Sequence, residues 1–152
     1  MAMDISRLSF LIVDDDPTML EIVAAILQQF GVVWIRKCAS GTEAVNALSD
    51  PSYTCHCIIS DYSMSPMSGL QLLQSIRMGR IENARRETAF IMVTVSGKEQ
   101  VVRTALALDV GAYVVKPVNA ASLMKAIERT FAKLFMAKAP DAYAGVNTNI
   151  DS

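Results

Sequence analysis

The chain has little of what marks several common classes of protein. Its 152 residues carry a net charge of −1, so no basic excess points to nucleic acid or to an anionic membrane surface. No apolar run approaches the roughly 20 residues that cross a bilayer, and the first residues lack the basic and apolar regions of a signal peptide. We therefore expect a cytoplasmic protein with no membrane insertion and no direct contact with nucleic acid.

Cysteine is also scarce, and three cysteines do not build a disulfide framework. Cys55 and Cys57 flank His56, the single histidine, and a Cys-His-Cys metal site is one interpretation. Alternate residues of a strand point to opposite faces, however, so His56 would face away from both thiols. A tetrahedral site would also need a fourth ligand. We favour two buried thiols in a reducing compartment.

Apolar residues, in contrast, are abundant and regularly arranged. They make up 52% of the chain, with a mean hydropathy of +0.32. Short apolar runs predict strands at 10–13, 32–37, 57–60, 90–94 and 112–115. Amphipathic stretches predict helices at 17–30, 41–48, 69–78, 97–108 and 120–135, and capping-box patterns begin at Ser40, Ser68 and Ser96. Five successive β-α units indicate an α/β fold with a parallel sheet and helices on both faces.

Two segments do not fit this alternation. Residues 77–88 form a long, arginine-rich connection, which we interpret as a solvated face. Residues 137–152 are small, polar and non-periodic, and we expect them to be a disordered C-terminal tail. The ordered domain is then predicted to span residues 1–136.

The residues that follow the strands carry the chemistry. In parallel sheets of this kind ligands bind beyond the carboxyl ends of the strands. Asp14 and Asp15 follow the first strand, Asp61 follows the third, Thr94 ends the fourth and Lys116 follows the fifth. Carboxylates held together repel one another unless a cation neutralises them, and Mg²⁺ is a hard cation that prefers oxygen ligands. One carboxylate could then attack phosphorus, with the lysine and the threonine hydroxyl supporting the transferring oxygens.

Four segments together resemble a known family. They are Leu11-Ile-Val-Asp-Asp-Asp-Pro17, Ile58-Ile-Ser-Asp-Tyr-Ser-Met64, Met92-Val-Thr94 and Gly111-Ala-Tyr-Val-Val-Lys-Pro117. The chain resembles a response-regulator receiver domain of the single-domain chemotaxis type, from about residue 8 to residue 135. The resemblance implies a flavodoxin-like fold with five parallel strands in the order 2-1-3-4-5.

The same resemblance implies a phosphoacceptor site. Asp61 matches the residue that takes a phosphoryl group from a histidine kinase or a histidine phosphotransfer protein. Asp14 and Asp15 match the acids that hold Mg²⁺ together with Asp61 and the backbone carbonyl of Ser63. Lys116 matches the lysine of the site and is expected to precede a cis peptide bond.

A signalling output is implied as well. Thr94 matches the hydroxyl that contacts the phosphoryl group, and Tyr113 matches the aromatic switch residue that alters a surface for a downstream protein target. The chain departs from the family pattern in three places. The segment Met64-Ser-Pro-Met-Ser-Gly69 displaces the usual proline by one position and has serine where aspartate is usual. Val95 stands where a small residue is usual, and the connection at residues 77–88 is longer than is typical.

Two alternatives remain at this point. Asp14-x-Asp16-x-Thr18 after an apolar strand matches the opening motif of haloacid-dehalogenase-type phosphatases, with Asp14 as nucleophile and Asp16 as acid/base. That family needs a second acidic pair after a later strand, and the chain offers none there; Asp16 before Pro17 is better explained as a helix cap. The other alternative is a receiver that serves only as a docking module, without phosphorylation.

Overall fold

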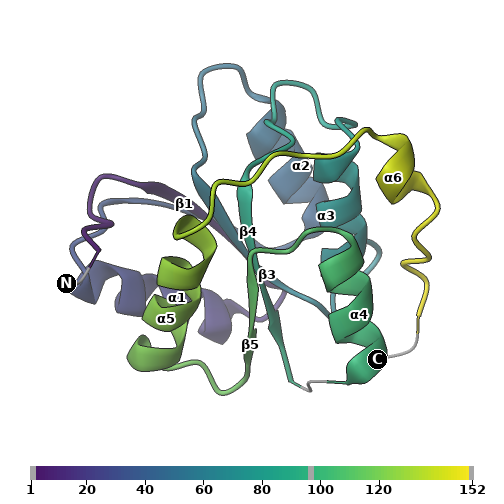
Figure 1. The fold of residues 1–152 in the computed structure, drawn as a ribbon. Coiled ribbons are helices and arrows are strands. Elements are labelled where there is room, and N and C mark those ends of the chain that lie inside the picture. The colour runs from purple at the N-terminus through teal and green to yellow at the C-terminus, as the bar shows by residue number, and fades with distance from the viewer. Residues whose placement is uncertain (1–2, 96–97, 151–152) are drawn as a thin grey trace.

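A five-stranded parallel sheet forms the centre of the molecule (Figure 1). The computed structural model describes residues 3–95 and 98–150. The strands are β1 (Ser9–Val13), β2 (Trp34–Cys38), β3 (Cys57–Asp61), β4 (Ala89–Thr94) and β5 (Ala112–Val115), in the order β2-β1-β3-β4-β5. The helices are α1 (Pro17–Gln29), α2 (Gly41–Ser49), α3 (Gly69–Arg77), α4 (Glu99–Ala107), α5 (Ala120–Phe131) and α6 (Asp141–Ala144). The predicted fold class and strand order are confirmed.

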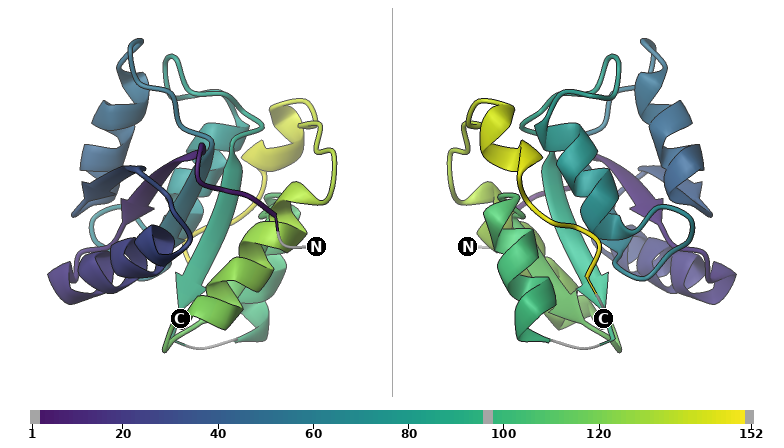
Figure 2. Two further views of the ribbon diagram at one scale, coloured as in Figure 1. Left: turned by 90° about the vertical axis from the view of Figure 1, so that its left-hand side faces the viewer. Right: turned by 90° about the vertical axis from the view of Figure 1, so that its right-hand side faces the viewer.

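Two layers of helices bury the two faces of the sheet (Figure 2). Because successive strand residues point to opposite faces, Leu11 and Val13 join the core shared with α2, α3 and α4. Phe10 and Ile12 join the core shared with α1 and α5. Strand β3 lies between β1 and β4 and is buried along its whole length, which fits its apolar start, Cys57-Ile-Ile59, before the polar Ser60 and Asp61.

Local signals explain most of the helix starts. Asp16 caps α1 through its side chain, and Ser68 forms a complete capping box with Gln71 at the start of α3. Ser40 caps α2 through its side chain, but the capping box predicted there is incomplete. The carboxylate of Glu43 accepts a hydrogen bond from the backbone amide of Ala39 instead of from that of Ser40. The third predicted box begins at Ser96, which lies outside the described residues.

The C-terminal segment 137–152 differs from the prediction of a disordered tail. Through residue 150 it packs along α3, and within it the short helix α6 buries the ring of Tyr143 completely. The side-chain amide of Gln74 donates to the carbonyl oxygens of Tyr143 and Val146, both at 2.9 Å. A single helical turn is too short to show periodicity, so long-range contacts order this segment where local sequence could not.

The arginine-rich connection is not simply a solvated face either, because Arg77 is 1% exposed. Its guanidinium donates to the carbonyl oxygens of Arg86, Thr88, Leu108 and Asp109 and lies over the ring of Phe135. Burial lowers the pKa of Arg77 to about 10. This side chain ties the connection to the end of α4. The fork-shaped guanidinium satisfies several buried carbonyls that the loop would otherwise leave unpaired.

Candidate functional site

Strand register brings the predicted site residues to one edge of the sheet. Val13 pairs with Ser60, Asp61 with Val93, and Thr94 with Val115. The residues at or just beyond these positions therefore meet at the carboxyl ends of β1, β3, β4 and β5. Backbone hydrogen bonds also fix the residues that follow β1 and β5. The amide of Asp14 donates to the carbonyl oxygen of Cys38, and the amide of Lys116 donates to the carbonyl oxygen of Thr94.

Three carboxylates cluster there. Asp14, Asp15 and Asp61 each offer an oxygen, and these oxygens all lie within 4.8 Å of one another. Asp14 is 4% exposed and Asp61 is 6% exposed, whereas Asp15 faces solvent. Acidic oxygens at such spacing around a water-accessible mouth fit a small, hard divalent cation. Within the described part of the chain, no comparable group includes His56 with the cysteines.

Lys116 completes the charge arrangement. Its Nζ lies 3.2 Å from Asp61 Oδ1 and 3.4 Å from Asp14 Oδ2. Burial raises the pKa of Asp61 to about 6, and repulsion from Asp14 and Asp15 adds to this effect while Lys116 opposes it. Burial tends to lower the pKa of Lys116, but attraction to Asp61 and Asp14 outweighs burial and raises it. One lysine therefore leaves the three acids with excess negative charge, which a cation can neutralise.

The remaining predicted residues divide between the site and its surroundings. Thr94 is 4% exposed at the end of β4, and Ser63 lies exposed in the loop that follows β3. Tyr113 is 44% exposed on the edge strand β5, outside the acid cluster. The expected cis peptide bond precedes Pro117. Another cis peptide bond, between Ser65 and Pro66, lies in the loop where the sequence departs from the family pattern.

The other polar residues singled out in the sequence have structural roles. The Asp16 carboxylate accepts from the amide of Thr18 and caps α1. The exposed His56 accepts at Nδ1 from the amide of Ser9, 2.8 Å away. Cys57 is fully buried and Cys55 is half-buried. These contacts leave the acid cluster as the chemically distinctive group.

Gly69 is a site residue that sequence reasoning missed. A Cβ added there would lie 2.4 Å from the carbonyl oxygen of Asp61 and 2.7 Å from Met92 Sδ. The first turn of α3 therefore packs directly on the end of β3, at a distance that excludes any side chain. The only signal in the sequence was a glycine following a helix cap, and that pattern has many other causes.

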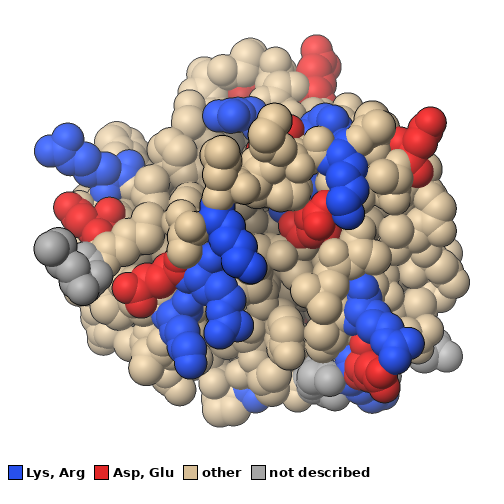
Figure 3. Space-filling model, viewed as in Figure 1, with Lys and Arg blue, Asp and Glu red and all other residues tan. Residues whose placement is uncertain are grey.

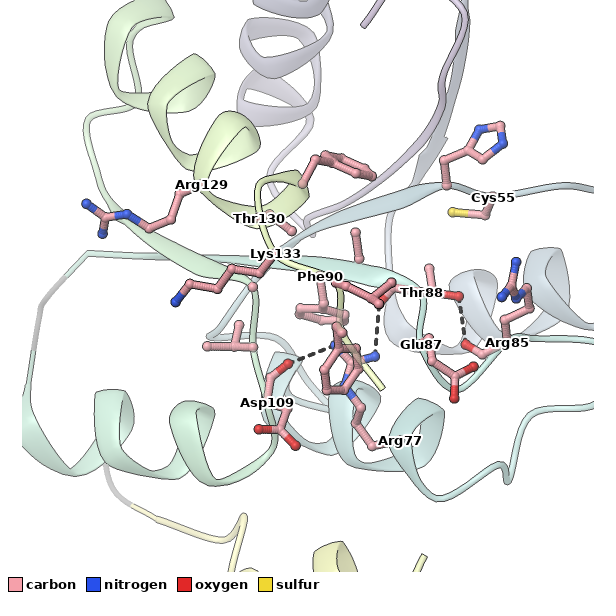
Figure 4. Close-up of a pocket in the computed structure, with 17 residues that line it drawn as sticks. Cys55, Arg77, Arg85, Glu87, Thr88, Phe90, Asp109, Arg129, Thr130 and Lys133 are labelled. Carbon is pink, nitrogen blue, oxygen red and sulfur yellow. Dashed lines mark hydrogen bonds between the residues drawn. The ribbon is translucent and has the colours of Figure 1, made fainter. Parts of the chain in front are cut away.

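The acid cluster does not lie in the cavity of about 460 Å³ shown in Figure 4. That cavity is at the amino ends of β4 and β5, and its lining includes Phe90, Arg129 and Lys133. The side chain of Arg77 also lines this cavity, and its guanidinium donates hydrogen bonds to backbone carbonyls. The acid cluster therefore lies at the carboxyl edge of the sheet, at the opposite ends of the strands from this cavity.

Comparisons with known proteins agree with this geometry. The family described as the response regulator receiver domain matches residues 10–128. Chemotaxis protein CheY1 of Helicobacter pylori strain J99 is 32% identical over 121 residues, covering 80% of this chain and 94% of that protein. A probable chemotaxis protein CheY of Rhizobium etli is 29% identical over 128 residues, covering 84% of this chain and 95% of that protein.

A solved structure shows the same architecture. Chemotaxis protein CheY4 of Vibrio cholerae, crystallised at pH 4.0, superposes with a TM-score of 0.71 and is 26% identical. The alignment covers 81% of this chain and 98% of that one. The chain described here therefore belongs to the response regulator receiver domain family, and it is a CheY-like signalling domain of the chemotaxis type.

Proposed function

We propose that the domain is a phosphorylation switch in which Asp61 takes a phosphoryl group from a histidine kinase or a histidine phosphotransfer protein. The observation that carries this proposal is the buried Asp61 carboxylate, which lies 3.2 Å from Lys116 Nζ and within 4.8 Å of two further acids. A buried carboxylate supported by a lysine at a water-accessible edge can act as a nucleophile towards phosphorus.

The residues divide the work of the transfer. An Asp61 oxygen attacks the phosphorus of a phosphohistidine, the phosphorus–nitrogen bond breaks, and the freed imidazole leaves with the bonding electron pair. The ammonium of Lys116, beside Asp61, would offset negative charge on the transferred group. The hydroxyl of Thr94, a residue at the same edge of the sheet, would donate a hydrogen bond to it. Asp14, Asp15, Asp61 and the Ser63 carbonyl would hold Mg²⁺, which when bound neutralises charge on the phosphoryl oxygens. Hydrolysis of the resulting acyl phosphate by water returns the free carboxylate, and we assign both reactions to the domain itself.

The proposed output is a change at the surface formed by α4, β5 and α5. Tyr113 is exposed on β5 and borders a groove of about 370 Å³ between β5 and α5. Lys125 and Arg129 line this groove, and basic side chains gather over this face in Figure 3. We infer a downstream protein target that presents acidic groups to this surface, with Thr94 and Tyr113 coupling it to Asp61.

The proposed setting is the cytoplasm, where phosphorylated histidines of two-component systems are presented. No helix within residues 3–95 and 98–150 is long and apolar enough to span a membrane. Direct binding to nucleic acid is not part of the proposal, because the net charge of −1 gives no basic excess.

Intact-mass measurement after incubation with acetyl phosphate and Mg²⁺ tests the phosphoacceptor. The unaltered chain should gain one phosphoryl group, Asp61→Asn should gain none, and Asp16→Asn should behave as the unaltered chain because asparagine caps a helix as well as aspartate. Phosphorylation mapped to Asp14 would instead support the phosphatase-type alternative. A chain that binds its target equally with and without Asp61 would support the docking-module alternative.

The switch is tested separately with beryllofluoride, which mimics a phosphoryl group. The ring position of Tyr113 and the affinity for the target should both change when the mimic is added. Thr94→Ala should abolish both responses, since the hydroxyl is then absent. If both responses persist in Thr94→Ala, this coupling is not the switch.

A further inference from the structure

The last part of the C-terminal segment lies against the loop that follows the phosphoacceptor. We call residues 147–150 the latch and residues 62–68 the acceptor loop. The hydroxyl of Tyr62 donates to the carbonyl oxygen of Ile150 at 3.1 Å, and the side-chain amide of Gln71 donates to Asn149 Oδ1 at 3.2 Å. Figures 1 and 2 show this segment descending from α6 beside α3 and α4 towards the carboxyl ends of the strands.

These contacts reach both ends of the acceptor loop. Tyr62 is its first residue and directly follows Asp61. Gln71 holds the other end, because its Oε1 accepts from the backbone amide of Ser68 at 2.9 Å within the capping box of α3. The amide of Gly69 donates to the carbonyl of Tyr62 at 2.9 Å, which brings the two ends together. The latch therefore holds the base of the loop that carries Ser63.

Residues 143–146, which we call the anchor, precede the latch and hold it close to the acceptor loop. Tyr143 is fully buried, and its hydroxyl donates to Asp109 Oδ2 at 2.7 Å. Gln74 adds two hydrogen bonds to backbone carbonyls of residues 143 and 146. Beyond Val146 the side chains are half-buried or exposed, so residues 147–150 can open without disturbing the anchor. Tethering gives the latch a high effective concentration at its own binding surface.

We propose that the latch positions the acceptor loop and thereby strengthens binding of a divalent cation at the Asp14, Asp15 and Asp61 cluster. The proposal rests on the proposed function, because it assigns the backbone carbonyl of Ser63 to the cation. A loop held at both ends loses less conformational freedom when one of its carbonyls binds a cation. By thermodynamic linkage, the bound cation must favour the closed latch over the open latch by the same factor by which the closed latch strengthens cation binding.

The test measures Mg²⁺ affinity and latch opening on the full chain. Amide chemical shifts followed by NMR during a MgCl₂ titration give the dissociation constant, and amide hydrogen exchange of residues 148–150 reports latch opening. Tyr62→Phe removes the hydroxyl that contacts Ile150, and Asn149→Ala removes the acceptor for Gln71. Matched controls are Tyr53→Phe, which removes the hydroxyl of a half-buried tyrosine ahead of β3, and Asn46→Ala on the exposed face of α2.

Each latch variant should raise the dissociation constant for Mg²⁺ about two- to fivefold, because this factor corresponds to the loss of one neutral hydrogen bond. The control variants should leave the dissociation constant unchanged. Saturating Mg²⁺ should slow exchange of the latch amides by a similar factor in the unaltered chain and have no effect in Asp61→Asn. Equal Mg²⁺ affinities in the latch variants and the unaltered chain, with binding still lost in Asp61→Asn, would overturn the latch but not the phosphoacceptor. Failure of the unaltered chain to bind Mg²⁺ would overturn both.

Discussion

Replacing Asp61, the proposed phosphoacceptor, should make the metal-free domain more stable near neutral pH. Asp61 has a pKa of about 6 in the folded protein, against 3.8 when unperturbed. A carboxyl whose pKa is raised by folding holds its proton more tightly in the native state. The ionised group therefore costs no stability below its unfolded pKa, costs progressively more as the pH rises towards 6, and has its full effect above that.

The size of the effect follows from the same shift. Two pKa units correspond to at most about 3 kcal/mol, and solvent at the mouth of the site screens part of this, so we expect a gain of about 1–2 kcal/mol for Asp61→Asn. Removing the negative charge relieves its burial and its repulsion by Asp14 and Asp15, which together exceed the attraction of Lys116. The ionised carboxylate of the proposed phosphoacceptor therefore lowers the stability of the metal-free domain.

Urea unfolding followed by circular dichroism, with EDTA present, measures the difference. At about pH 7 the variant should unfold at higher urea than the unaltered chain. At about pH 3, below the unfolded pKa of 3.8, the two should converge because Asp61 is then largely protonated in both states. Asp16→Asn is the control, since it removes one negative charge from an exposed cap and keeps the cap. Added Mg²⁺ should stabilise the unaltered chain and narrow the gap. A gain that persists undiminished at the lower pH, or that Asp16→Asn reproduces, would refute this account of the site.

Further variants test the supporting structure. Gly69→Ala should destabilise the domain by about 1–3 kcal/mol and slow phosphorylation, because the new methyl group would meet the backbone of β3, whereas Gly145→Ala meets nothing within 4 Å and should do neither. Arg77→Lys should cost about 2–4 kcal/mol in urea unfolding, since an ammonium cannot serve all the carbonyls that the guanidinium serves, and Arg80→Lys on the exposed surface is its control. Val95→Ala should speed phosphorylation by acetyl phosphate about two- to fivefold by removing a branched side chain, 73% exposed, beside the proposed phosphoryl-binding hydroxyl; an unchanged or lower rate in a mass-based time course would contradict this.

The order of elements and the place of the site were readable from local patterns. Apolar runs and capping residues located all five strands and the five long helices, mostly within one or two residues. The last long helix is the main exception. It was predicted to run to residue 135, but α5 ends at Phe131 and Leu134 beyond it is 94% exposed. Parallel strands then bring their carboxyl ends to one edge whatever the details of packing. The clustering of Asp14, Asp15 and Asp61 therefore follows from their positions after β1 and at the end of β3.

Three features depended on contacts that no local pattern contains. The local sequence around an arginine in a polar connection does not distinguish a solvated side chain from a buried one. Arg77 is buried among carbonyls from distant segments. A glycine after a helix cap gives no sign that, like Gly69, it packs against the backbone of another strand. The C-terminal segment shows no periodicity, yet Tyr143 finds a buried position between α3 and α4. Periodicity and capping are properties of neighbouring residues, whereas burial, perturbed charge and the ordering of a short segment arise only when distant parts of the chain exclude water from one another.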